Sequence, residues 1–262
     1  MKSGICEDVP VTDQQALFDY LLRLGDNSLI LGQRLAEWSG HAPILEEELA
    51  LANIGLDLVG QARMLLTYAG EVEGKGRDED RLAFHRDTKA WRNLLLLEQP
   101  NENFAKTMAR QLLFDAFQYL QYEGLSLSTD DRLSGIAVKS LKEITYHRRH
   151  SSNWVIRLGD GTEESHGKMQ AAIDELWGFV PEMFDMDAVD EAMTEAGIGV
   201  DAAALKPAWD DYINGMLANA TLTRPEDSWC VRGSREGKHS EHLGYLLAEM
   251  QFLQRAYPDA TW

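Results

Sequence analysis

The chain has 262 residues, 44% hydrophobic and 26% charged, as in an ordinary globular protein rather than a disordered or fibrous one. Its 25 Lys and Arg residues against 43 Asp and Glu residues give a net charge of −18, which argues against nucleic acid and anionic membrane surfaces as partners. Cys6 and Cys230 fit neither a disulfide framework nor a metal-ligand spacing. Since the N-terminus is polar and no apolar run approaches about 18 residues, we expect a soluble, cytoplasmic protein.

Helical periodicity runs through nearly every long segment, and almost none alternates as a strand would. It predicts four long helices, over residues 12–38, 43–69, 104–125 and 131–158. Thr12 and Gln15 resemble a capping box, and Pro43 suits a first-turn position. Asn103 could cap the third long helix, and Asp201 caps the shorter helix that begins there. Shorter helices are predicted in the connection 78–99 and over residues 162–184, 187–196, 201–222 and 242–257.

A long connection separates the first pair of long helices from the second pair. One long crossover between two helix pairs is typical of ferritin-like bundles. The pattern therefore predicts an all-α chain: a single ferritin-like four-helix domain over residues 1–262, with additional C-terminal helices packed on the bundle.

Ferritin-like di-iron enzymes need a carboxylate on each of two helices and Glu-x-x-His on each of the other two. Glu-x-x-His occurs twice here, but both copies lie beside glycines outside the long helices, so coincidence is the better interpretation: Glu163 with His166, and Glu236 with His239. Helical periodicity places six residues at inward positions of the long helices, namely Ser28, Leu58, Gln61, Asp115, Ile144 and His147. Among them only Asp115 and His147 are plausible ligands. Glu37, Asp57 and Glu143 lie off the apolar faces, where solvated or edge positions suit them better. A metal site needs at least three protein ligands, so Asp115 and His147 are insufficient.

Four segments carry a close resemblance to a known family. They are LRLGDNSLILGQRLAEWSGHAPILEEELALANIGLDLVGQAR (22–63), NLLLLEQPNENFAKTMARQ (93–111), KEITYHRRHSSNWVIRLGDGT (142–162) and HSEHLGYLLAEMQFLQR (239–255). The chain resembles, over essentially its whole length, the C-subunit family of bacterial phenylacetyl-CoA epoxidases. These multicomponent monooxygenases of phenylacetate catabolism epoxidise the aromatic ring with dioxygen and electrons from an NADPH-linked reductase.

The resemblance also implies where the ligands of the paralogous di-iron subunit fall in this chain. The corresponding positions are Ser28, Leu58, Gln61, Asp115, Ile144 and His147. Four of these six positions hold no ligand of that site. The resemblance therefore implies a structural chain with no catalytic, cofactor-binding or metal-ligating residues, which scaffolds the di-iron catalytic subunit of the same complex.

Two other functions stay open. The chain could be a metal-dependent ferritin-like oxygenase in its own right, using Asp115, His147 and nearby carboxylates. It could also be a free-standing ferritin-like binding protein. Iron content of the isolated chain separates the first alternative from the scaffold, and co-purification with the di-iron subunit separates the second.

Several polar residues have two interpretations each. Asp115 and His147 are either a remnant site or a buried structural pair, and we expect them to lie within hydrogen-bonding reach, directly or through water. Arg148 and Arg149 either contact CoA phosphates or a partner carboxylate, or are ordinary solvated charges. The cluster His239, Glu241, His242 and Glu249 lacks zincin spacing, and a junction packed on a partner or on the bundle suits it better.

The long helices also hold more apolar positions than one inward stripe requires. The surplus residues are Leu22, Leu29, Trp91, Leu113, Phe117 and Tyr119. Because interface cores are rich in aromatic residues, they predict a helix-to-helix interface above about 2,000 Å². We expect the di-iron subunit to occupy it, or a second copy of this chain when the di-iron protein is absent.

Overall fold

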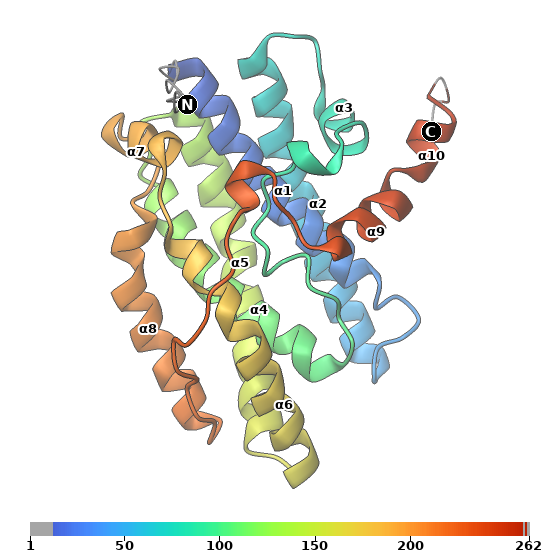
Figure 1. The fold of residues 1–262 in the computed structure, drawn as a ribbon, viewed down its shortest axis with the longest axis vertical. Coiled ribbons are helices and arrows are strands. Elements are labelled where there is room, and N and C mark those ends of the chain that lie inside the picture. The colour runs from blue at the N-terminus through green and yellow to red at the C-terminus, as the bar shows by residue number, and fades with distance from the viewer. Residues whose placement is uncertain (1–12, 259, 261–262) are drawn as a thin grey trace, which may run out of the picture.

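The computed structural model describes residues 13–258 and 260, and within them it contains helices and turns but no strand (Figure 1). Four long helices form the bundle: α1 (Asp13–Ala36), α2 (Leu45–Glu73), α4 (Phe104–Leu125) and α5 (Asp131–Gly159). The predicted all-α class and the four long helices are therefore confirmed.

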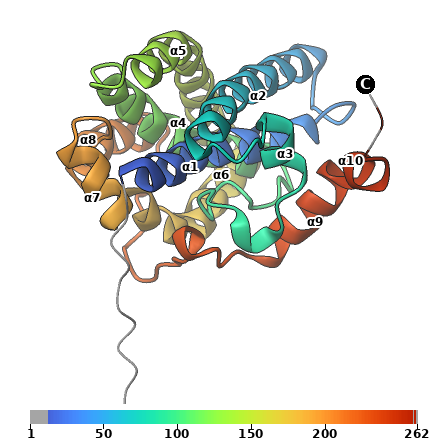
Figure 2. The ribbon, with the colours of Figure 1, turned by 90° about the horizontal axis from the view of Figure 1, so that it is seen from above.

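The bundle consists of two antiparallel pairs, α1 with α2 and α4 with α5, and α2 also packs on α5 (Figure 2). Gly32 and Gly55 let α1 and α2 approach closely, since a Cβ atom added at Gly32 would lie 3.2 Å from the Gly55 carbonyl oxygen. The connection between the pairs holds only α3 (Glu79–Phe84) and the short 3₁₀ turn η1 (Thr88–Ala90). This is the long crossover expected of a ferritin-like bundle.

Side-chain caps determine where several helices begin. Asn103 accepts a hydrogen bond from the Lys106 backbone N–H, and Asp201 accepts one from that of Ala204, as the sequence predicts. Pro43, in contrast, precedes the start of α2 at Leu45, so the prediction that it occupies the first turn is wrong. The predicted cap at Thr12 lies outside the described residues.

The remaining helices pack around the bundle. They are α6 (Glu163–Leu176), η2 (Trp177–Phe179), η3 (Pro181–Phe184), α7 (Ala188–Glu195), α8 (Ala202–Asn219), η4 (Ser234–Glu236), α9 (Glu241–Met250) and α10 (Phe252–Ala256). The single helix predicted over 162–184 ends instead at Leu176 and continues as two 3₁₀ turns, because Pro181 lacks the N–H that an α-helix needs. The last predicted helix is divided at Gln251, whose side chain donates hydrogen bonds to the backbone of residues 83 and 86.

Most of the surplus apolar residues belong to the core of this chain, so the prediction that they form an interface with another subunit is wrong. Trp91, Leu113 and Phe117 are buried, as are Leu22 and Leu29. Helices outside the four-helix bundle cover these residues. The α8 residue Trp209 donates from Nε1 to the Leu113 carbonyl at 3.0 Å, and Phe184 contacts Phe117 edge-on, with 5.5 Å between ring centroids.

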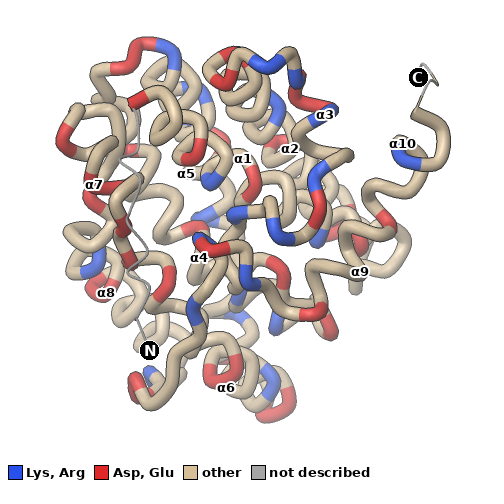
Figure 3. The backbone as a smooth tube through the Cα atoms, turned by 45° about the horizontal axis from the view of Figure 1, so that its top comes forward, with Lys and Arg blue, Asp and Glu red and all other residues tan. Residues whose placement is uncertain are grey.

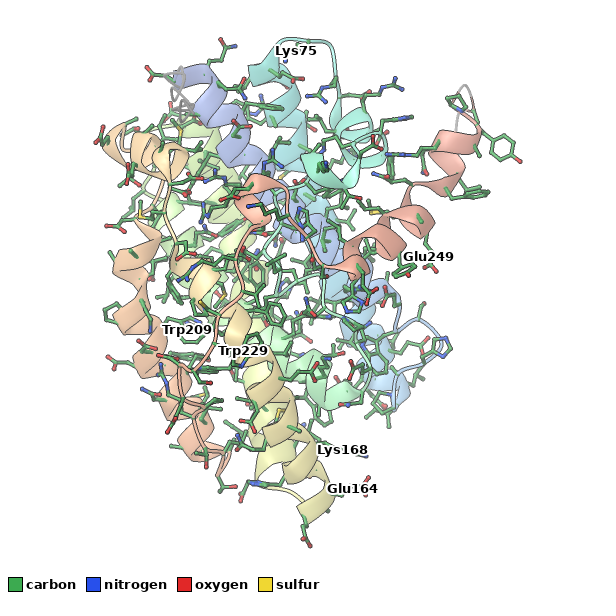
Figure 4. The ribbon with its side chains drawn as sticks, in the orientation of Figure 1. Lys75, Glu164, Lys168, Trp209, Trp229 and Glu249 are labelled. Atoms are coloured by element: carbon green, nitrogen blue, oxygen red, sulfur yellow. The ribbon has the colours of Figure 1, made fainter. Side chains whose placement is uncertain are left out.

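Figure 4 shows Trp209 on the side of α8 toward the bundle. Tyr119 is half-buried beneath the Arg148 guanidinium rather than in the core. The second apolar face of α4 is therefore used mainly within the chain.

Helix α2 is unusually apolar for a helix with only one buried side. By length and composition alone it could cross a membrane, so the expectation that no segment is apolar enough is not met. Its inner face supplies core residues such as Leu51, Leu58 and Leu65, as in the core helix of a soluble bundle. The excess apolarity comes from its outer face, where Leu45, Leu49, Leu56 and Val59 are exposed.

Candidate functional site

The centre of the bundle is the place where a ferritin-like di-iron protein would hold its ions. The six positions singled out from the sequence are all buried there: Ser28, Leu58, Gln61, Asp115, Ile144 and His147. Periodicity therefore located the inward faces of all four helices correctly. What these positions can do depends on the groups that they bring together.

One side of the interior is a chain of two buried amides that ends on the half-buried carboxylate of Glu143. The Gln118 amide donates to Gln61 Oε1 at 3.3 Å, and the Gln61 amide donates to Glu143 Oε2 at 3.0 Å. Burial raises the pKa of the neighbouring Tyr122 phenol to about 12, so this group stays protonated. Amides and a phenol in these places hold the helices together, but they lack the carboxylates that bridge two irons.

Asp115 is the only carboxylate among the six positions. Its Oδ2 atom accepts a hydrogen bond of 2.7 Å from the Ser151 hydroxyl, while Oδ1 has no hydrogen-bond partner among the described residues. Burial raises the pKa of the carboxyl to about 6, against the opposing influence of the His147 charge and the Ser151 hydrogen bond. The residue is therefore held by one neighbour and is only partly compensated for its removal from water.

His147 has a different partner from the one predicted. Its Nε2 atom lies 3.0 Å from Asp57 Oδ2, on the half-exposed edge of α2, whereas its Nδ1 atom has no partner among the described residues. Asp115 and His147 both face the interior, as predicted, but no direct hydrogen bond joins them. Asp57 lies at the edge of its helix face, as the sequence predicts, but a half-exposed carboxylate there can still reach an inward imidazole.

This donor set does not fit a di-iron centre. Ser28, Leu58 and Ile144 offer a hydroxyl and two hydrocarbons instead of carboxylates, and the Ser28 hydroxyl donates to the Leu24 carbonyl of its own helix. Among residues 13–258 and 260, no three His, Cys, Asp or Glu side chains gather closely enough to hold a metal ion. Structural and catalytic metal sites take at least three protein ligands.

The two Glu-x-x-His sequences make no site either. His166 Nδ1 lies 2.7 Å from the Gly159 carbonyl oxygen, whereas Glu163 is exposed. His239 is buried, with Nδ1 2.9 Å from Glu98 Oε2 and Nε2 3.0 Å from the Trp91 carbonyl oxygen. Each histidine thus binds the bundle instead of its Glu.

The cluster around His239 divides in the same way. Glu241 and Glu249 are exposed and His242 is half-buried, and Figure 4 labels Glu249 on α9. Burial lowers the pKa of His239, but its hydrogen bond to Glu98 and the charge of that carboxylate outweigh burial, so the pKa is raised overall. The junction before α9 is therefore fixed to the crossover by a charged pair, as the packing interpretation expected.

Sequence reasoning missed a second buried polar network, which fastens the crossover to α1. Asp26 is fully buried and pairs with the Arg86 guanidinium, and it also accepts from the Arg92 backbone N–H at 2.9 Å. The next residue, Asn27, accepts from the Leu94 backbone N–H at 2.8 Å. The signal was the polar run Asp26–Ser28 inside an otherwise apolar helix.

Three other residues of interest, Arg148, Arg149 and His150, lie on α5 away from the bundle centre. Arg149 is exposed, whereas Arg148 is half-buried with its guanidinium 3.4 Å from the Tyr119 ring centroid. His150 lies on the edge of the bundle face, where Nε2 is 2.8 Å from Glu47 Oε2. None of these groups contacts the bundle centre.

Comparison with known proteins agrees with the resemblance seen in the sequence. Residues 6–262 match the sequence model of the family described as "Phenylacetic acid catabolic protein". One relative is the C subunit of the 1,2-phenylacetyl-CoA epoxidase from Escherichia coli (strain K12). It is 52% identical over 243 residues, which are 93% of this chain and 98% of the relative.

Proposed function

Because the chain belongs to the phenylacetic acid catabolic protein family, we propose that it is the structural, non-catalytic subunit of a cytoplasmic phenylacetyl-CoA epoxidase. In this proposal, the residues form one ferritin-like domain that supports a paralogous di-iron subunit. That partner epoxidises the aromatic ring of phenylacetyl-CoA with dioxygen and reductase-supplied electrons. The present chain contributes no metal ligand and no catalytic side chain.

The observation that carries this proposal is the chemistry of the bundle centre. Ser28, Leu58, Gln61 and Ile144 occupy the inward positions where a ferritin-like enzyme needs ligands, and all four are buried. Hydrocarbon and amide groups fill the centre of this bundle. A paralogue of this kind retains the fold of the catalytic subunit but lacks the metal ligands that its reaction needs. Such a chain suits a supporting role in a complex.

The outer face of α2 is the surface that best suits the partner. We call it the α2 stripe: Ile44, Leu45, Leu49, Leu56 and Val59, with exposed fractions between 45% and 69%. A groove beside it is lined by residues of α1, of the turn after α1 and of α2, including Gly32, Trp38 and Ala52 respectively. Contiguous exposed apolar surface of this kind marks protein interfaces in soluble proteins.

A helix of the di-iron subunit laid along the α2 stripe would remove these side chains from water. We expect this contact to be part of an interface in the obligate class, above about 2,000 Å². Without the partner, a second copy of this chain can cover the same stripe.

The alternative of an independent metal-dependent oxygenase rests on Asp115 and His147. It is disfavoured because these residues bind Ser151 and Asp57 respectively and no third ligand lies with them among the described residues. A free-standing binding protein is disfavoured by the α2 stripe, which would remain in water.

Two measurements on the full chain test the proposal. Metal analysis of the purified chain is expected to find less than one iron per chain, and about two would establish the alternative oxygenase. Co-expression with the tagged di-iron subunit is expected to give a stable complex.

The interface is tested by the double substitution Leu49→Ser and Leu56→Ser, which should prevent co-purification. Leu127→Ser is the matched control, because Leu127 is 83% exposed and lies outside the stripe. A complex that tolerates the double substitution would move the interface elsewhere, and failure of the unaltered chain to bind would remove the scaffold function.

A further inference from the structure

A groove between α5 and α8 lies outside both the bundle centre and the α2 stripe. It has a volume of about 630 Å³, within the range of ligand pockets. Lys142, Arg148 and Arg149 line it together with apolar side chains that include Ile156 and Met216. The groove thus offers cationic and apolar walls to one ligand.

The charge of this region is opposite to that of the whole molecule. Acidic residues occur on most of the helices, including α7 and α8 (Figure 3), in a chain of net charge −18. Helix α5, in contrast, carries six cationic residues and only two acidic ones. Most cations elsewhere in the described chain are neutralised by ion pairs, whereas Lys142, Arg148 and Arg149 take part in none. A local excess of unpaired cations attracts anions, and it does so most strongly inside a concave surface.

The arginines are held in place by aromatic rings. The Arg148 guanidinium lies 3.4 Å from the Tyr119 ring centroid and 4.9 Å from that of Tyr212. Arg149 lies 5.7 Å from the ring centroid of Tyr146, which is itself 40% exposed. Stacking on these rings leaves the guanidinium N–H groups unpaired and reduces the conformational entropy that a ligand must remove.

The three cationic side chains of the groove favour a phosphate ligand over a single carboxylate. Arginine forks match phosphate oxygens, and three cations in one groove suit the several charges of a diphosphate. The exposed Tyr146 ring offers a stacking surface, and Ile156 and Met216 offer an apolar one. An aromatic base attached to a diphosphate satisfies all of these features together.

We propose that the α5–α8 groove binds the phosphates of a nucleotide diphosphate, either a free nucleotide or the nucleotide part of coenzyme A. This site does not depend on the scaffold function. Absence of nucleotide binding would not contradict the scaffold function, because binding is measured on the full chain alone, without the di-iron subunit.

Isothermal titration calorimetry of the full chain with three probes tests this site: inorganic pyrophosphate, ADP and coenzyme A. Binding of ADP or coenzyme A is expected, and Lys142→Ala with Arg149→Ala should weaken it at least about tenfold, as expected for loss of hydrogen bonds to a charged group. Both side chains are exposed, so the double variant should fold, and its unchanged melting temperature verifies this. Arg157→Ala is the matched control: it removes an exposed cation of the same helix outside the groove, and the affinity should stay within about twofold.

The probes also separate the two sources of the ligand. Equal affinities for ADP and coenzyme A assign the site to nucleotide diphosphates in general, whereas a clear preference for coenzyme A assigns it to that cofactor. The proposal is overturned if no probe binds at millimolar concentration, or if the double variant binds as tightly as the unaltered chain. It is also overturned if only an acidic peptide such as oligoglutamate binds, since the groove would then receive a protein partner.

Discussion

His147 binds Asp57 across the α2–α5 seam, with 3.0 Å between Nε2 and Oδ2, and it makes no hydrogen bond to Asp115. The two residues of a ferritin-like centre that still have ligand chemistry have thus acquired separate partners. Each now fixes a contact between helices: His147 joins α5 to α2, and Asp115 joins α4 to α5 through Ser151. The centre works as a packed polar core, and its stability is the property to measure.

Asp115→Asn should change the pH dependence of stability. The pKa of Asp115 in the folded chain is about 6 against an ordinary value of 3.8, so its contribution is fully present below the ordinary value and is lost as pH rises from about 4 to 6. Above pH 6 the loss in the free energy of unfolding is about 3 kcal/mol. The neutral amide should remove it, and the variant should unfold at a higher temperature at pH 7 than the unaltered chain. Urea unfolding between pH 4 and 8 checks this.

Asp211→Asn is the control, because Asp211 is exposed on α8 and its substitution should leave the profile unchanged. Asp115→Ala should instead destabilise the chain by about 1–3 kcal/mol, because the Ser151 hydroxyl loses its acceptor in the core. Equal pH profiles for Asp115→Asn and the unaltered chain would contradict the raised pKa.

The Asp26–Arg86 pair should be the most sensitive electrostatic contact in the fold. Both side chains are almost completely buried, so Asp26→Ala leaves the Arg86 cation in the core without its counterion. We expect a loss of about 3–5 kcal/mol in the free energy of unfolding. Glu71→Ala, which breaks the exposed and solvent-screened pair with Arg132, should change the free energy of unfolding far less. Similar costs for the two substitutions in chemical denaturation would show that the buried pair does not hold the crossover.

His239 should make the junction before α9 weaken as pH rises above the ordinary histidine pKa of 6.5. Its pKa is raised above the ordinary 6.5, so the stabilisation is fully present below that pH and is lost as pH rises through the higher value of the folded state. Hydrogen exchange of the α9 amides should therefore speed up above neutrality in the unaltered chain more than in His239→Gln. His41→Gln alters an exposed histidine and serves as the control. Exchange that responds to pH identically in all three proteins would argue against the charged pair with Glu98.

Local patterns in the sequence predict those parts of the fold that depend on local chemistry. Asn103 and Asp201 could be predicted as N-caps because a short side chain that accepts hydrogen bonds, directly before a segment with helical apolar periodicity, typically caps that helix. Inward faces followed from the helical period, which is why Ser28, Leu58 and His147 were all correctly placed in the interior.

Contacts between residues far apart in the sequence cannot be predicted from such local patterns. In the sequence of α4 alone, Leu113 and Phe117 resemble exposed apolar residues, but α8 and the 3₁₀ turn before Asp185 cover them. The helical period of α4 cannot reveal this, because α8 follows about 90 residues later in the chain. The partner of His147 was likewise missed, since Asp57 sits at the edge of its own helix and only the seam between helices brings them together. Gln251 ends α9 because it donates to the crossover backbone, which is another long-range cause.

The most direct test of the account is the turnover of phenylacetyl-CoA by the reconstituted complex with its reductase. The di-iron subunit is assayed with the unaltered chain, with the Leu49→Ser and Leu56→Ser double variant of the α2 stripe, and with no added chain. Ring epoxidation is expected only when the unaltered chain is bound, with all the iron in the other subunit. Full activity of the di-iron subunit without this chain, or stoichiometric iron in this chain, would contradict it.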